Sequence, residues 1–127
     1  MKTKRTALIT GASSGLGVEY AKLCAADGHD VVLVARSEGK LRELASELSQ
    51  KHGITAHVYP ADLSRADGPR GLFDALARDG VTVDILVNNA GLGYVSDFRS
   101  STTASELEMV HVNVTALTEL THLFLPG

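Results

Sequence analysis

The sequence is poor in the residues that build disulfide bonds and metal sites. Its one cysteine, Cys24, has no partner for an internal disulfide, and its position in a helical pattern suits a small buried apolar residue. The five histidines show no HxxxH or other recognised metal-binding spacing. We therefore expect neither a metal site nor a catalytic cysteine.

A strong charge of one sign and a long apolar run are also lacking. The formal net charge of -3 offers no basic surface for nucleic acid. The apolar run behind the basic start MKTKR ends at Gly11, too soon for a signal-peptide core or a membrane span. The sequence predicts a cytoplasmic protein that binds neither membrane nor nucleic acid, and 127 residues suit one domain.

Short β-branched runs alternate with longer amphipathic runs, a rhythm typical of βαβ units with a parallel sheet. Gly28, Gly53 and Gly80 stand where the intervening helices should end. Right-handed crossovers favour the strand order 3-2-1-4. The predicted fold class is α/β, a Rossmann-type parallel sheet that is incomplete, with helices on both faces. Its four strands are expected at residues 6–10, 31–35, 56–59 and 83–88.

The last predicted helix, from about Ser101 to Leu125, carries two apolar stripes on nearly opposite sides. One stripe can cover the sheet, whereas the other needs a further partner. The apolar strand at 83–88 would likewise lie at a sheet edge. We expect either a homo-oligomer formed through this strand, the last helix or both, or additional chain; the alternative is tighter packing of the last helix.

The segment TGASSGLG, residues 10–17, joins the first strand to the first helix. Glycines allow the backbone to turn sharply and to approach a ligand, while the helix directs its free N–H groups to the same place. This geometry suits a pyrophosphate, although a purely structural turn would use glycines too.

The spacing T-G-x-x-x-G-x-G resembles that of the short-chain dehydrogenase/reductase family of NAD(P)-dependent oxidoreductases. Asp62-Leu63, the NNAG segment at 88–91 and Asn113 within HVNV are similar to further motifs of that family. The resemblance implies that Asp62 and Leu63 contact adenine, that NNAG borders the cofactor, and that Asn113 is the catalytic-site asparagine. The implied cofactor-binding residues in these motifs are Gly11, Ser13, Ser14, Gly15, Leu16, Gly17, Asp62, Leu63, Asn89, Ala90 and Gly91.

Each assignment has a structural alternative. Asp62 can cap a turn, Asn88 and Asn89 can satisfy backbone groups beyond a strand, and Asn113 can face solvent.

The end of the second strand predicts the choice of cofactor. A carboxylate at this place favours NAD because it accepts hydrogen bonds from the ribose 2′-hydroxyl and repels a 2′-phosphate. Here Ala35 is followed by Arg36, whose guanidinium can bind the 2′-phosphate of NADP, and Ser37 adds a hydroxyl. NADP is therefore expected over NAD; the alternative is a solvated arginine at a helix start.

One motif of the family is missing. Its proton-transferring tyrosine lies in Y-x-x-x-K, but Tyr20, Tyr59 and Tyr94 have no lysine four positions on. The resemblance therefore implies that residues 1–127 are the dinucleotide-binding portion of a domain whose catalytic part is absent. In full length, such an oxidoreductase would transfer hydride between NADP and a carbonyl or alcohol substrate. The alternative is a stand-alone, non-catalytic half-domain that binds nucleotide or oligomerises.

Overall fold

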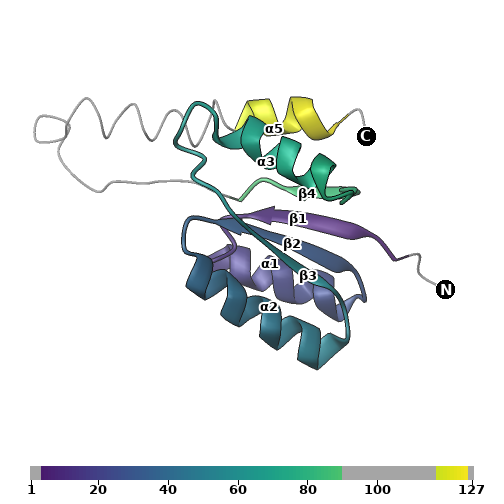
Figure 1. The fold of residues 1–127 in the computed structure, drawn as a ribbon. Coiled ribbons are helices and arrows are strands. Elements are labelled where there is room, and N and C mark those ends of the chain that lie inside the picture. Colours follow the sequence, from purple (N-terminus) through teal and green to yellow (C-terminus); the bar gives the residue numbers. More distant parts are fainter. Residues whose placement is uncertain (1–3, 90–116, 126–127) are drawn as a thin grey trace, which may run out of the picture.

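The computed structural model describes residues 4–89 and 117–125 as strands alternating with helices (Figure 1). The elements in chain order are β1 (Thr6–Thr10), α1 (Gly15–Ala26), β2 (Asp30–Ala35), α2 (Glu38–His52), β3 (Ala56–Pro60), α3 (Gly68–Arg78), β4 (Ile85–Val87) and α5 (Leu117–Phe124). The alternation expected from the sequence is confirmed. The predicted amino-terminal part of the last helix lies outside the described residues.

The four strands form one parallel sheet in the order β3-β2-β1-β4, as predicted. Ile9 in the central β1 is in register with Leu33 of β2 on one side and with Val87 of β4 on the other. Because parallel strands all point the same way, the segments that follow β1 to β4 meet at the carboxyl edge of the sheet.

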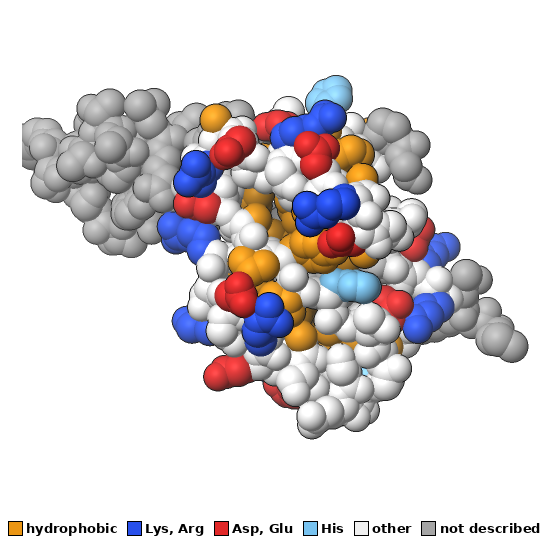
Figure 2. Space-filling model, in the orientation of Figure 1, with side chains coloured by type: hydrophobic (Ala, Val, Ile, Leu, Met, Phe, Trp, Pro, Cys, Tyr) orange, Lys and Arg blue, Asp and Glu red, His pale blue; other side chains and the backbone are white. Residues whose placement is uncertain are grey.

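Helices α1 and α2 cover one face of the sheet, and α3 and α5 cover the other (Figure 1). Successive β1 residues alternate between two buried clusters: Ile9 joins the α1 and α2 side, and Leu8 joins the α3 and α5 side. Figure 2 shows apolar side chains gathered between the charged side chains of the helices. None of the helices in the described part of the chain is long and apolar enough to cross a membrane.

Strand β4 is shorter than the predicted 83–88. Asp84 already bonds to β1, since its N–H donates to the Thr6 carbonyl and its carboxylate accepts the Thr6 N–H, both at 2.9 Å. At the other end, the N–H of Asn89 donates to the carbonyl of Val87 at 3.0 Å. This local turn ends the extended conformation at Val87.

The helix ends agree with the prediction. Each of α1, α2 and α3 is followed within two residues by a glycine of positive φ. Gly53, for example, caps α2 in the left-handed conformation with φ 68°, which glycine adopts without steric cost.

Candidate cofactor-binding site

The predicted cofactor residues that the structure describes lie on segments leaving the carboxyl edge of the sheet. The glycine-rich turn follows β1, Arg36 and Ser37 follow β2, Asp62 and Leu63 follow β3, and Asn89 follows β4. Neighbouring segments are tied by backbone bonds: the N–H of Ala61 donates to the carbonyl of Ala35 at 3.0 Å. Ala90, Gly91 and Asn113 lie outside the described residues.

The glycine-rich turn is held against the sheet and leads directly into α1. Gly11 and Gly15 have φ of 67° and 57°, a region that side-chain-bearing residues rarely adopt. Between them, the Ala12 N–H donates to the carbonyl of Val34 at 3.1 Å. Ser14 occupies the N-cap of α1 but its side chain makes no capping bond. The Ser14 side chain therefore does not occupy the N–H groups of the first helical turn, which can bond to an anion.

Gly17, near the start of α1, lies very close to the backbone of the glycine-rich turn. A Cβ added there would stand 2.0 Å from the carbonyl oxygen of Gly11 and 2.8 Å from Nδ2 of Asn89. Only glycine lets α1 start so close to the turn. Ser13 is half-buried, whereas Leu16 is 63% exposed and so can contact a ligand. The turn therefore fits a dinucleotide pyrophosphate.

Two asparagines at the end of β4 connect neighbouring elements. Asn89 donates from its side-chain Nδ2 to the carbonyl of Gly11 at 3.4 Å, and from its backbone N–H to Thr10 Oγ1 at 2.9 Å. Asn88 donates from Nδ2 to Thr121 Oγ1 of α5 at 3.1 Å. The structural role given as an alternative is present for Asn89, which satisfies a backbone carbonyl of the glycine turn, whereas Asn88 bonds a side-chain hydroxyl.

Asp62 accepts two hydrogen bonds on Oδ1, from the backbone N–H of Ser64 at 3.0 Å and from its hydroxyl at 2.5 Å. The Ser64 hydroxyl is the main reason that the pKa of Asp62 is lowered; the nearby Arg36 and Arg65 guanidinium groups lower it further. Asp62 is half-buried and Arg36 is exposed. A carboxylate and a guanidinium thus follow the ends of the neighbouring strands β3 and β2.

Three residues that shape this site were not predicted from the sequence. Thr10 anchors Asn89 through its hydroxyl, Ser64 fixes Asp62, and Gly68 lets α3 begin against the Asp62 backbone. A Cβ at Gly68 would lie 2.3 Å from the Asp62 carbonyl oxygen. The serine two residues after an aspartate is a readable turn signal, whereas the contacts of Thr10 and Gly68 join segments that the sequence alone does not align.

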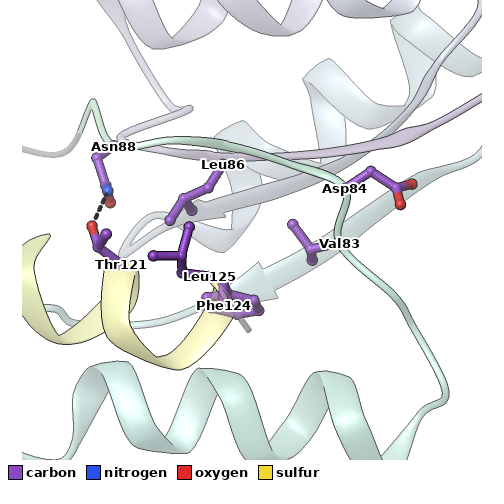
Figure 3. A pocket seen from close by; sticks show the side chains of 7 residues that line it. All are labelled: Val83, Asp84, Leu86, Asn88, Thr121, Phe124 and Leu125. Carbon is purple, nitrogen blue, oxygen red and sulfur yellow. Dashed lines mark hydrogen bonds between the residues drawn. The ribbon is translucent and has the colours of Figure 1, made fainter. Parts of the chain in front are cut away.

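A separate groove of about 410 Å³ lies between β4 and α5 (Figure 3). Leu86, Val83 and Asn88 border it from the β4 side; Phe124 at the end of α5 and Leu125 just after it border it from the other side. Among the described strands, β4 pairs only with β1, so its other edge faces this groove. Leu120 of α5 is buried with the α3 side of the core, so this residue of the last predicted helix packs toward the sheet. Most of the two predicted apolar stripes lies outside the described residues.

Comparison with known proteins places these features in a family. A family model described as short chain dehydrogenase matches residues 5–127. A very-long-chain 3-oxoacyl-CoA reductase from Laccaria bicolor is 35% identical over 125 residues, which cover 95% of this chain and 36% of the reductase. A probable NADP-dependent dehydrogenase from Dichelobacter nodosus is 47% identical over 85 residues, covering 67% of this chain and 76% of that protein.

The solved structures include a short-chain dehydrogenase from Sphingobium yanoikuyae in complex with NADPH. It superposes with a TM-score of 0.89 at 38% identity, covering 96% of this chain and 47% of that chain. The present chain thus spans about a third of the Laccaria reductase and about half of the Sphingobium dehydrogenase. The glycine-rich turn, the sheet order and the family match agree: the chain belongs to the short-chain dehydrogenase family.

Proposed function

We propose that this chain is the NADP-binding portion of an oxidoreductase that transfers hydride between NADP(H) and a carbonyl or alcohol substrate. The observation that carries the proposal is the turn at residues 10–17, where a Cβ at Gly17 would collide with the Gly11 carbonyl oxygen. Such close packing at a helix start leaves room for a diphosphate against the backbone. The NADPH complex of the Sphingobium relative and the reductase name of the Laccaria relative support the same function.

Each group at the carboxyl edge has a role in this proposal. The diphosphate is bound by the glycine-rich turn, which runs from Gly11 to Gly17 and includes Ser13, Ser14, Gly15 and Leu16. Arg36 and Ser37 bind the 2′-phosphate, and Asp62 with Leu63 borders the adenine. Asn89, Ala90 and Gly91 border the rest of the cofactor, and Asn113 belongs to the catalytic site. When bound, the nicotinamide would supply or accept the hydride.

Arg36 gives the proposal its sharpest test. The exposed guanidinium replaces the carboxylate that would favour NAD, so Arg36→Asp should weaken NADPH binding at least tenfold and NADH binding far less. The dissociation constants can be measured by titration of the reduced nicotinamide fluorescence. Arg5→Asp makes the same charge change just before β1, at the opposite edge of the sheet, and should leave both constants within twofold. Equal losses for both cofactors in Arg36→Asp would remove Arg36 from the phosphate site.

The groove between β4 and α5 favours a second candidate: a stand-alone half-domain that binds nucleotide and forms a homodimer through β4, α5 or both. Sedimentation of this chain tests it, because a stable monomer at high concentration contradicts the dimer. Dehydrogenase activity of such a dimer would contradict its non-catalytic character, since neither copy supplies Y-x-x-x-K. We place either form in the cytoplasm, without nucleic-acid or membrane partners.

A further inference from the structure

We propose that Ser64 is a positioning residue for the adenine end of the cofactor: it holds one oxygen of the Asp62 carboxylate and directs the other toward the base amine. This inference rests on the proposed NADP-binding function. Ser64 would thereby affect which base the site prefers, because it positions the Asp62 carboxylate.

The Asp62 side chain is fixed by a short local structure. Both the backbone N–H and the hydroxyl of Ser64 donate to the same oxygen, Oδ1. The Asp62 carbonyl in turn accepts the N–H of Arg65 at 3.2 Å, and Gly68 packs against that carbonyl so closely that a Cβ would stand 2.3 Å away. The backbone and the carboxylate of Asp62 are therefore held together, which removes much of the rotational freedom that ligand binding would otherwise have to restrict.

The second oxygen, Oδ2, accepts no hydrogen bond from any of the residues that the structure describes. Ser64 also contributes most to lowering the pKa of Asp62, so the carboxyl group stays ionised at neutral pH and can only accept hydrogen bonds. An acceptor of this kind suits the exocyclic amine of adenine. It repels the carbonyl oxygen that hypoxanthine carries at the same ring position.

The place of Asp62 in the fold supports an adenine neighbour. The backbone bond from Ala61 to Ala35 brings the end of β3 beside the end of β2, one residue before Asp62 and Arg36 respectively. Strands β2 and β3 are in register up to Ala35 and Pro60, so Arg36 and Asp62 leave the sheet from neighbouring strand ends. In the proposed complex, the Arg36 guanidinium would bind the 2′-phosphate. The Asp62 carboxylate, at the neighbouring strand end, would face the adenine attached to the same ribose.

The test compares reduced NADP with its hypoxanthine analogue, in which a carbonyl oxygen replaces the adenine amine. Wild-type protein should bind NADPH about tenfold more tightly than the analogue, as expected for one hydrogen bond to a charged group. In Ser64→Ala this preference should fall to about twofold, mainly through weaker NADPH binding. Ser64→Thr keeps the hydroxyl and should restore the preference. Ser46→Ala removes an exposed serine hydroxyl from α2 and should leave the preference at its wild-type value.

Melting temperatures measured in parallel report whether each variant is folded. A Ser64→Ala variant that is folded and still prefers NADPH tenfold would overturn the inference, and so would one that loses affinity for both ligands equally. If the wild-type chain binds NADPH but does not discriminate against the analogue, the role of Ser64 fails while the proposed function stands. If the wild-type chain binds neither ligand, the proposed function itself fails.

Discussion

The backbone N–H of Asn89 donates to Oγ1 of Thr10 at 2.9 Å, joining residues 79 positions apart in the sequence. The Thr10 hydroxyl donates in turn to the carbonyl of Val87 at 3.4 Å, and Thr10 is only 1% exposed. One buried hydroxyl therefore fixes the end of β4 against the end of β1, next to the glycine-rich turn.

Replacing Thr10 by valine should destabilise the protein by about 0.5–1.5 kcal/mol, because the Asn89 N–H loses one of its two acceptors and keeps only the Val87 carbonyl. Thr10→Ser keeps the hydroxyl and should preserve most of this contribution. Urea unfolding followed by circular dichroism measures both variants. Similar unfolding free energies for Thr10→Val and the wild type would show that solvent replaces the hydroxyl without cost.

Gly17→Ala should displace the glycine-rich turn, since the new methyl group would stand 2.0 Å from the carbonyl oxygen of Gly11. We expect a loss of about 1–3 kcal/mol in stability from overpacking and at least a tenfold weaker NADPH binding. Gly39→Ala is the matched control in α2, where no atom lies within 4 Å of the added Cβ. That variant should be unchanged or up to about 1 kcal/mol more stable. Wild-type NADPH affinity in Gly17→Ala would argue against the pyrophosphate site.

Leu120 should contribute strongly to the packing of α5. It is 1% exposed and belongs to the cluster that includes Leu72 and Leu76 of α3. Leu120→Ala should cost about 2–5 kcal/mol of unfolding free energy. Leu23→Ala, at a position 67% exposed on α1, should change stability by no more than about 0.5 kcal/mol. Equal effects of the two substitutions in denaturant unfolding would contradict this placement of α5.

Tyr59 and Asp79 should make stability depend on pH in the alkaline range. Burial and the hydrogen bond from the Tyr59 hydroxyl to Asp79, at 2.6 Å, raise the pKa of Tyr59 to about 12, above the 10.0 of a free phenol. The unfolded chain releases this proton first, so the contribution is complete below about pH 10 and is lost as the pH rises to about 12.

Absorbance at 295 nm during alkaline titration measures this ionisation. Tyr59→Phe should remove a step centred near pH 12, and Asp79→Asn should move that step to lower pH without reaching 10.0, because burial also contributes. A Tyr59 step that Asp79→Asn leaves in place would show that the carboxylate does not affect the phenol.

The sequence by itself determined the order and kind of the elements in the described part. Alternation of β-branched and amphipathic runs predicted four parallel strands and their order, because a parallel strand must be covered on both faces and right-handed crossovers leave few topologies. The glycines that end the helices were readable for a local reason, since left-handed backbone favours glycine whatever surrounds it.

Only the tertiary structure decided which atoms support the candidate site. The contact between Thr10 and Asn89, the approach of Gly17 to Gly11 and the length of β4 depend on how distant segments are aligned in space. Periodicity along the chain does not encode such alignment to a fraction of an ångström. Hydrogen bonds and steric exclusion act at that scale, and they are set by the packing of the whole sheet and its helices.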